Sequence, residues 1–263
     1  MLSAAHAHSP VGPIPVFNGG AADAVRFCLD AVKSGDGAWV ATANLDYVAL
    51  ARRDPELRAL LREATLVVAD GAPVAWLARI SGASRARRVA GVDLVCHIFA
   101  SAAHPLRVVL YGSTSPIAHA AARHLEQTYP AVRVVGVVCP PFTELSGPER
   151  EAECALLQDL APDVVLVALG CPKQEQLIVR YRAACPAAVW IGVGGTFDFF
   201  AGHRRRAPGL VQRLGGEWLI RLAQEPRRLW RRYLLHDIPA LIAVAPSCMG
   251  TRIRGRPTSP ATE

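Results

Sequence analysis

Short β-branched runs alternate with helical patterns along most of this chain, and no other feature constrains its fold as much. Each run ends in a turn, and apolar residues with helical spacing follow. The six runs are AWVATAN (38–44), TLVVADG (65–71), RVVLYGS (107–113), VRVVGVV (132–138), DVVLVALG (163–170) and AVWIGVGG (188–195). Strands that alternate with helices form mostly parallel sheets with helices on both faces. The sequence therefore predicts an α/β fold.

The character of the chain changes after Ala201, where arginines stand among Trp, Tyr and Leu. There we expect a helix over about 216–224, a break at Pro226 and a second helix. Both ends of the chain are poor in large apolar residues, so we expect them to be mobile. The predicted parts are a flexible N-terminus (1–14), an α/β core (15–202), an Arg-rich helical appendage (203–245) and a flexible tail (246–263).

Positive charge is concentrated in the appendage. The chain has a net charge of +7, and between Arg204 and Arg232 nine arginines face only two acids, Glu217 and Glu225. Such a segment indicates a polyanionic partner, whether phosphate, nucleic acid or a lipid headgroup. Basic residues beside Trp, Tyr and Leu are typical of a membrane-surface helix, and equally of a helix that docks on its own domain.

Several classes of protein have little support in the sequence. No run approaches eighteen consecutive apolar residues and the N-terminus lacks a signal-peptide pattern, so we expect a cytosolic chain without a spanning helix. The seven cysteines are scattered without a C-x-x-C pair, and the histidines have no ligand partners nearby. We therefore expect reduced thiols, no metal site and no cofactor.

Polar residues and glycines collect where the predicted strands end. Parallel strands bring their carboxyl ends to one edge, and ligands of α/β proteins bind there. The residues at this edge are Thr42, Asn44, Asp70, Gly112, Ser113, Gly170, Gln174, Gly194, Gly195 and Asp198. None of these turns matches G-x-G-x-x-G or a P-loop, which weakens the interpretation of a dinucleotide or ATP site.

Several longer motifs occur in order over most of the chain. They are T-A-N (42–44), A-D-G-x-P (69–73), R-V-x-G-x-D-L (88–94), V-A-L-G-x-P-K-Q-E (167–175), G-V-G-G-T-F-D-F-x-A-G (192–202), R-A-P (206–208) and E-W-L-x-R-L-x-x-E-P-x-R-L-x-R-R-Y-L (217–234). Together they resemble the WecG/TagA/CpsF glycosyltransferases. The resemblance implies a Rossmann-like core with a C-terminal helical appendage.

The resemblance also implies an activity: an inverting, metal-independent transferase that moves a sugar from a UDP-linked donor to a polyprenyl-diphosphate-linked sugar. Family members use N-acetylmannosamine, its uronic acid or glucose, in cell-envelope or exopolysaccharide synthesis. The protein would lie on the inner face of the cell membrane, against an anionic surface, and some members self-associate through the core. Two alternatives stay open, a nucleotide-binding enzyme of another class and, less favoured, a nucleic-acid-binding protein that uses the Arg-rich end.

Roles for single residues follow from the resemblance. Asp70 matches the base that would deprotonate the acceptor hydroxyl, although an Asp-Gly turn that caps the next helix would look the same. Departing UDP needs positive charge, and this sequence has no D-x-D pair for a metal, so arginines would supply it. Arg88 is the candidate from the core, and those from the appendage are Arg221, Arg228 and Arg231.

The remaining edge residues would bind sugar or nucleotide. Thr42, Asn44 and Gln174 would hydrogen-bond hydroxyls, although capping of strand ends is the alternative for each. Gly194 and Gly195 would let the backbone approach the substrate, unless they form a merely structural turn, and Asp198 would accept a hydrogen bond from the uracil or ribose. Gly112 and Ser113 precede a predicted helix start whose free N–H groups could hold a phosphate, and Gly170 opens the loop that carries Gln174. An ion pair between Lys173 and Glu175 is expected to hold its loop.

Overall fold

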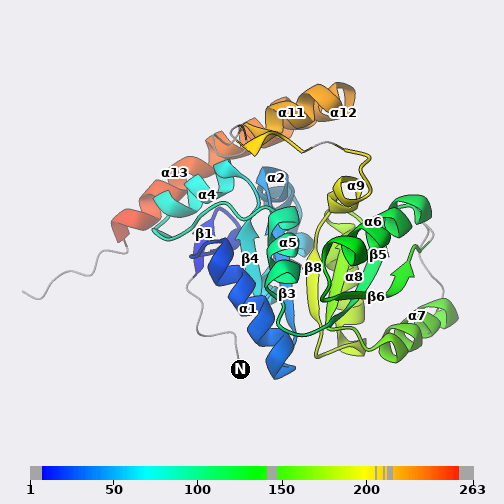
Figure 1. The fold of residues 1–263 in the computed structure, drawn as a ribbon. Coiled ribbons are helices and arrows are strands. Elements are labelled where there is room, and N and C mark those ends of the chain that lie inside the picture. The colour runs from blue at the N-terminus through cyan, green and yellow to red at the C-terminus, as the bar shows by residue number, and fades with distance from the viewer. Residues whose placement is uncertain (1–7, 141–146, 205, 210, 212–215, 255–263) are drawn as a thin grey trace, which may run out of the picture.

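The computed structural model describes residues 8–140, 147–204, 206–209, 211 and 216–254, and Figure 1 shows their arrangement. A six-stranded sheet forms the centre, and every pair of neighbouring strands in it is parallel. Its strands are β3 (Ala38–Ala43), β4 (Leu66–Ala69), β5 (Leu106–Gly112), β6 (Val132–Val138), β7 (Val164–Ala168) and β8 (Val189–Gly192), in the order β4-β3-β8-β7-β5-β6. The predicted α/β, Rossmann-like fold is confirmed.

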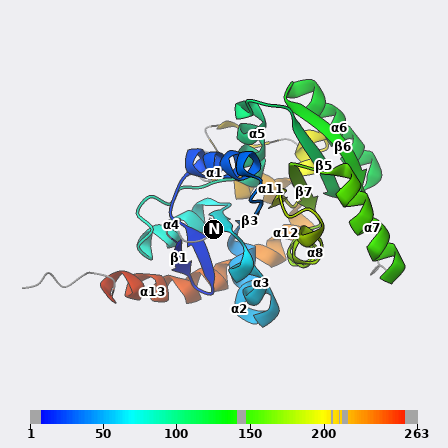
Figure 2. The same ribbon diagram turned by 90° about the horizontal axis from the view of Figure 1, so that it is seen from below.

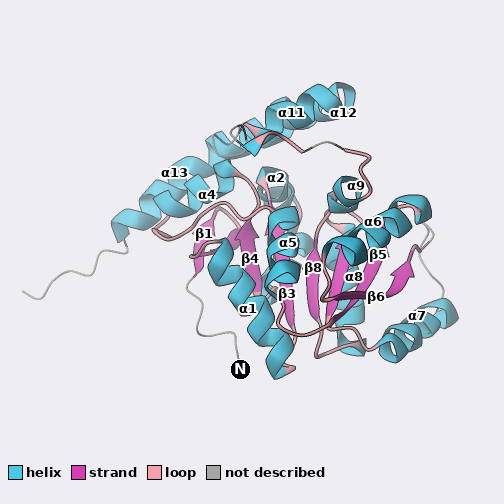
Figure 3. Ribbon diagram, viewed as in Figure 1, coloured by secondary structure: helices cyan, strands magenta, loops and turns pink. Residues whose placement is uncertain are grey.

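Helices cover both faces of the sheet, as the secondary-structure colouring shows (Figure 3). The helices on one face are α1 (Ala21–Ser34), α5 (Gly91–Ser101), α6 (Ser115–Thr128) and the short α9 (Thr196–Phe200). Those on the other face are α2 (Leu45–Arg53), α3 (Pro55–Glu63), α4 (Ala72–Ile80), α7 (Gly147–Leu160), α8 (Lys173–Tyr181) and the 3-10 turn η1 (Arg182–Ala184). Along β4, Leu66 and Val68 enter one core and Val67 and Ala69 the other, because strand side chains alternate between faces.

The expected flexible N-terminus (1–14) is wrong from residue 8 onward. Strands β1 (His8–Val11) and β2 (Ile14–Phe17) form an antiparallel hairpin. Val11 and Ile14 are buried in the same core as α4, and their burial stabilises this segment. Its Ser, Pro and Gly content alone predicts that it is mobile. Residues 1–7 lie outside the described part of the chain.

The appendage consists of α11 (Glu217–Gln224), α12 (Pro226–Arg232), the π-helical turn η2 (Tyr233–Asp237) and α13 (Ile238–Arg254). Its helices lie across the end of the sheet near α2 and α4 in Figure 1, and Figure 2 shows α13 passing alongside β1. The flexible tail expected at 246–263 is wrong through residue 254, since α13 continues and buries Cys248 against the core. Residues 255–263 are outside the described ranges.

One helical stretch of the described chain, Leu229–Gly250, is long and apolar enough to cross a membrane by length and composition. The expectation of no such segment rested on unbroken apolar runs, and this stretch is interrupted by Arg231, Arg232 and Asp237. Leu229, Ala240, Val244 and Cys248 on it are buried against the rest of the protein. One side of this stretch therefore packs against the folded core.

Candidate functional site

Two adjoining pockets lie at the carboxyl edge of the sheet, between the core and the appendage. The first, the apolar pocket, has a volume of about 340 Å³ and is bounded mainly by Leu45, Ala72, Pro73, Trp218, Tyr233, Ile238 and Leu241. The second, the polar pocket, has a volume of about 320 Å³ and is bounded mainly by polar side chains and glycines that follow β3, β7 and β8. Four residues line both pockets: Asn44, Asp70, Arg221 and Arg232.

Asp70 occupies the junction because of the local backbone. Its N–H donates to the carbonyl of Ala43 at 2.9 Å, which extends the β3–β4 pairing by one residue. Gly71 then turns the chain with φ +137, a conformation that favours glycine, and α4 begins at Ala72. Gly71 is the N-cap of α4, and no side chain caps this helix. The Asp-Gly turn is therefore real, but the Asp70 carboxylate does not cap the helix.

The surroundings of Asp70 favour a proton-accepting role. Its side chain is half-buried, and burial raises its pKa from 3.8 to about 6. The positive charges of Arg221 and Arg88 oppose that rise, while Glu217 and Asp93 add to it. A carboxylate with a pKa near 6 is mostly ionised at neutral pH and is a stronger base than an ordinary aspartate.

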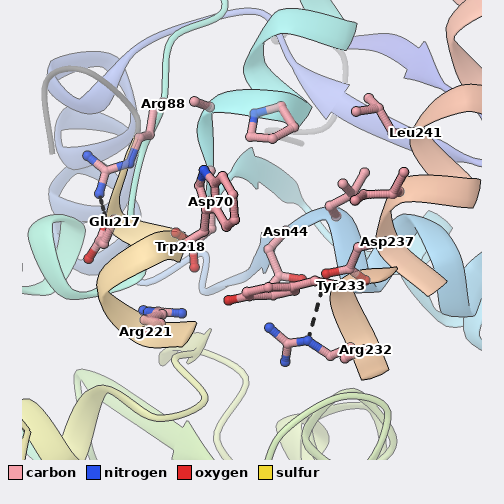
Figure 4. Close-up of a pocket in the computed structure, with 15 residues that line it drawn as sticks. Asn44, Asp70, Arg88, Glu217, Trp218, Arg221, Arg232, Tyr233, Asp237 and Leu241 are labelled. Atoms are coloured by element: carbon pink, nitrogen blue, oxygen red, sulfur yellow. Dashed lines mark hydrogen bonds and ion pairs between the residues drawn. The ribbon is translucent and has the colours of Figure 1, made fainter. Parts of the chain in front are cut away.

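Arginines surround this carboxylate, and Arg88 and Arg221 are among them. Figure 4 shows both on one side of Asp70, with Tyr233 and Arg232 on the other. Arg88 pairs with the carboxylate of Glu217, and its Nη1 lies 3.9 Å from Asp93 Oδ2. The Arg221 guanidinium stacks on the Phe199 ring at 5.7 Å, and within the described residues it has no carboxylate partner. Its charge is therefore available to a ligand in either pocket.

The hydroxyl-binding residues divide into two groups. Thr42 donates to the carbonyl of Gly192 at 2.6 Å and is almost fully buried, while Gln174 has partners for both ends of its amide inside the protein. Both line the polar pocket, but their hydrogen bonds within the protein support the capping alternative. Asn44 accepts from the N–H of Tyr47 at 3.3 Å and caps α2, which leaves its NH₂ for a ligand.

The glycine and acid predictions have mixed outcomes. Gly170, Gly194, Gly195 and Asp198 all line the polar pocket. Asp198 Oδ2 lies 3.7 Å from Arg204 Nε, so a cation that the sequence did not single out accompanies it there.

Gly112 and Ser113 lie at the end of β5 and line neither pocket, because β7 separates β5 from β8. A Cβ at Gly112 would stand 2.7 Å from the Ala168 carbonyl oxygen, so this glycine serves packing between strands.

The expected ion pair between Lys173 and Glu175 is wrong. Lys173 is exposed, whereas Glu175 is completely buried and accepts hydrogen bonds from Tyr47 and Gln174. Residues two positions apart on a helix point about 200° apart, so Lys173 meets solvent and Glu175 the core. Among the described residues, no group of three or more His, Cys, Asp or Glu side chains could hold a metal ion.

Comparison with known proteins identifies the family of the chain. A family model described as "Glycosyl transferase WecG/TagA/CpsF family" matches residues 10–254. The chain belongs to this family. The chain is 32% identical to the N-acetylglucosaminyldiphosphoundecaprenol N-acetyl-beta-D-mannosaminyltransferase of Bacillus spizizenii and 31% identical to that of Bacillus subtilis. Each match spans 199 residues, 75% of this chain and 75% of the relative. The protein is accordingly a glycosyltransferase.

This WecG/TagA/CpsF chain places its appendage arginines differently from the prediction. Arg231 is exposed, lies 5.4 Å from the Trp230 ring and lines neither pocket. Arg232 lines both, with Nη1 3.5 Å from Asp46 and Nε 3.7 Å from Asp237. Arg228 belongs to α12, but its side chain is outside the described part. Successive helical residues point about 100° apart, so an Arg-Arg pair signals one inward arginine without showing which.

Sequence reasoning also missed several residues of the apolar pocket, namely Glu217, Trp218, Tyr233 and Asp237. All four come from the appendage. Glu217, Trp218 and Tyr233 lie within the motif at 217–234, in which only arginines are predicted to bind substrate, and Asp237 lies beyond it. Burial raises the pKa of Asp237 to about 7, with Asp46 adding to the rise and Arg232 opposing it. The site therefore holds a second carboxyl group that titrates near neutrality.

Proposed function

We propose that this protein is an inverting, metal-independent glycosyltransferase that moves a sugar of the N-acetylmannosamine type from UDP to a polyprenyl-diphosphate-linked sugar. One observation carries the proposal: two pockets of opposite character meet at a carboxylate. A nucleotide sugar is polar over its whole length, whereas a lipid-linked sugar has a polar end and a long apolar tail. The paired pockets match these two substrates in chemistry, and Asp70 stands between them.

The polar pocket suits the donor and the apolar pocket the acceptor. Backbone of Gly194 and Gly195, the Asp198 carboxylate and the Arg204 guanidinium offer partners for ribose, base and phosphate. Trp218, Ile238 and Leu241 in the apolar pocket suit an isoprenoid chain. The names of the Bacillus relatives describe an acceptor of this kind, a sugar linked through diphosphate to undecaprenol.

The geometry supports a single displacement. Asp70 takes the proton of the acceptor hydroxyl while that oxygen attacks the anomeric carbon of the donor sugar. The bond from that carbon to the phosphate oxygen breaks, and UDP leaves with the electron pair. Arg221 and Arg232 lie where they offset the charge that grows on the diphosphate. Attack from the face opposite the leaving group inverts the anomeric centre, and an α-linked donor would give the β linkage in the relatives' names.

Attachment to the inner face of the membrane is part of the proposal. The appendage exposes many large apolar side chains beside its arginines: Trp218, Leu219, Trp230, Leu234, Leu235, Ile238, Ile242 and Met249. Such a surface would enter the headgroup region of an anionic bilayer. It adjoins the apolar pocket through Trp218 and Ile238, so a lipid-linked acceptor could reach the pocket from the bilayer.

A donor screen tests the proposal. UDP-linked N-acetylmannosamine, its uronic acid, N-acetylglucosamine and glucose would be offered with a synthetic polyprenyl-diphosphate-linked N-acetylglucosamine, and released UDP would be measured. We expect acceptor-dependent release with the N-acetylmannosamine donor, a β linkage by NMR, and full activity in EDTA. Absence of acceptor-dependent release with every donor would contradict the function. Retained configuration would contradict inversion, and loss in EDTA restored by Mg²⁺ would contradict metal independence.

A further inference from the structure

A buried polar network lies beneath the polar pocket, and the proposed displacement makes no use of it. It consists of Tyr47 on α2 and the neighbours Gln174 and Glu175 on α8, which are 4%, 1% and 0% exposed. Burying three such groups costs free energy unless each finds partners. Most of their polar atoms pair with one another or with one backbone N–H of the pocket wall, while Glu175 Oε2 has no hydrogen-bond partner among the described residues.

The hydrogen bonds fix the orientation of every group in this network. The Tyr47 hydroxyl donates to Glu175 Oε1 at 2.7 Å. Gln174 Nε2 donates to the same carboxylate oxygen at 2.9 Å and also to the Tyr47 hydroxyl oxygen. At the other end, Gln174 Oε1 accepts the Gly194 N–H at 3.1 Å. A flipped amide would turn its oxygen toward the Glu175 carboxylate, so only this orientation is satisfied.

Three separate loops meet through these bonds. Tyr47 also donates its backbone N–H to Asn44, which follows β3. Gln174 follows β7, and Gly194 follows β8. Gly192 leaves room for the connection, because a Cβ there would stand 2.7 Å from Gln174 Nε2. Asn44, Tyr47, Gln174 and Gly194 all line the polar pocket, so the network joins the walls of this pocket.

We propose that Tyr47 is a positioning residue for the nucleotide-sugar pocket, whose hydroxyl holds Gln174 and Glu175 and, through them, the Gly194 backbone in the arrangement that binds the donor. The inference rests on the proposed function, since it places a UDP-sugar in the polar pocket. Tyr47 also lines the polar pocket, but its hydroxyl is engaged by Glu175 and Gln174, so its effect on the donor passes through Gln174, Gly194 and Asn44.

Loss of the hydroxyl has a defined physical consequence. Without the hydroxyl, the Glu175 carboxylate loses one hydrogen-bond donor and Gln174 Nε2 loses one acceptor. Both side chains are buried, so the lost partners are costly. Gln174 and Glu175 then shift to find other hydrogen-bond partners. Gly194, which is bonded to Gln174, and Asn44, which is bonded to Tyr47, shift with them. Donor affinity should therefore fall while the core stays folded.

The test compares Tyr47→Phe with Tyr111→Phe in the full-length protein. Tyr111 is a matched control, because it is also buried, donates its hydroxyl to a carboxylate, Glu153, at 2.6 Å, and lines neither pocket. Affinity for UDP would be measured by titration calorimetry and stability by thermal unfolding. We expect similar losses of melting temperature, but a UDP dissociation constant that rises about tenfold only in Tyr47→Phe.

The outcomes separate this inference from the proposed function. Equal UDP affinities in the wild type and in Tyr47→Phe would overturn the inference alone. Absence of UDP affinity in the wild-type protein would overturn both the inference and the proposed function. A second variant, Glu175→Gln, provides a double-mutant cycle with Tyr47→Phe. If the two residues act through one network, their combined loss of UDP affinity is smaller than the product of the single losses. A full product of the two losses would contradict a shared network.

Discussion

At the scale of single residues, Asp70 is distinguished by a carboxylate that forms no hydrogen bond or ion pair with the described residues. Its backbone completes the pairing of β4 with β3, and Gly71 takes over the capping position of α4. The side chain is thereby left for the cavity, where burial raises its pKa and nearby arginines limit the rise. A polar side chain without a structural duty at a pocket junction is a strong candidate for chemistry.

Replacing Asp70 tests that assignment. In Asp70→Asn we expect kcat to fall about 10²- to 10⁴-fold, because proton transfer at the acceptor hydroxyl is lost. Affinity for UDP should stay within about twofold of wild type. Stability at pH 7 should be equal or higher, since a carboxyl whose pKa is raised on folding destabilises the fold once it is ionised. UDP release measures kcat, calorimetry measures UDP affinity, and thermal unfolding measures stability. Turnover near that of the wild type would show that Asp70 is not the base.

The pH dependence of the reaction follows from the same pKa. The base must be ionised, so kcat/KM should fall about tenfold per pH unit below pH 6 and level off above it. Asp237 titrates nearby, at about 7. The variant Asp237→Asn distinguishes the two groups, because the limb near pH 6 should persist in it. Disappearance of that limb in Asp237→Asn would reassign the essential ionisation to Asp237.

Two adjacent arginines make a matched pair for the leaving-group prediction. Arg232 lines both pockets, while its neighbour Arg231 is exposed and lines neither. We expect Arg232→Ala to lower kcat/KM about 10²-fold, because a cation that offsets diphosphate charge is removed. Arg231→Ala should remain within about threefold when assayed in detergent. Equal losses in the two variants would show that net positive charge, and not position, matters.

At the scale of elements, local patterns predicted the sheet well and the chain ends poorly. Each β-branched run became a strand. Five of the six are buried on both faces, as apolar parallel strands are, and that pattern is visible within a few residues, while the edge strand β6 is mostly half-buried. The N-terminal hairpin and the end of α13 instead stabilise each other. Gly12 at the hairpin turn packs so closely on Val244 that a Cβ at position 12 would stand 3.0 Å from its side chain. The two residues are more than 230 positions apart in the sequence. Local composition carries no information about such a partner.

Neighbouring positions on α13 test this docking. Val244 is 3% exposed and Ile242 is 67% exposed, two residues apart on one helix. Val244→Asp buries a charge without a partner and should destabilise the docked helix by about 3 kcal/mol or more. Ile242→Asp should leave the melting temperature unchanged. Thermal unfolding and limited proteolysis compare the two variants, and equal stability would mean that α13 contributes little to the fold.

At the scale of the whole molecule, the site is shared between core and appendage. The sequence could predict the core half, because the rule for parallel strands places Asn44, Asp70 and Gly194 at one edge. It could not predict that Arg232, Tyr233 and Asp237 face the pockets. Which side of a helix meets the core depends on how the helix docks, and α12, η2 and α13 present apolar residues on several sides. The family motif identified the segment but not its rotation.

That rotation also decides which apolar residues remain outside, and it leads to a prediction about membranes. Leu234 and Leu235 are each 56% exposed on the appendage and line neither pocket. Leu234→Asp with Leu235→Asp should lower binding to vesicles that contain anionic lipid at least tenfold, measured by sedimentation, because burial of both side chains in the headgroup region is lost.

Leu156 on α7 is the control. It is 44% exposed and lies on a helix of the α/β domain, far from the appendage in sequence. Leu156→Asp should bind vesicles as wild type does. Salt should weaken wild-type binding only in part, because apolar contact persists when the arginines are screened. If the double variant binds normally, or if Leu156→Asp loses binding equally, the appendage surface is not the membrane contact. The acceptor would then have to reach the apolar pocket through the aqueous phase.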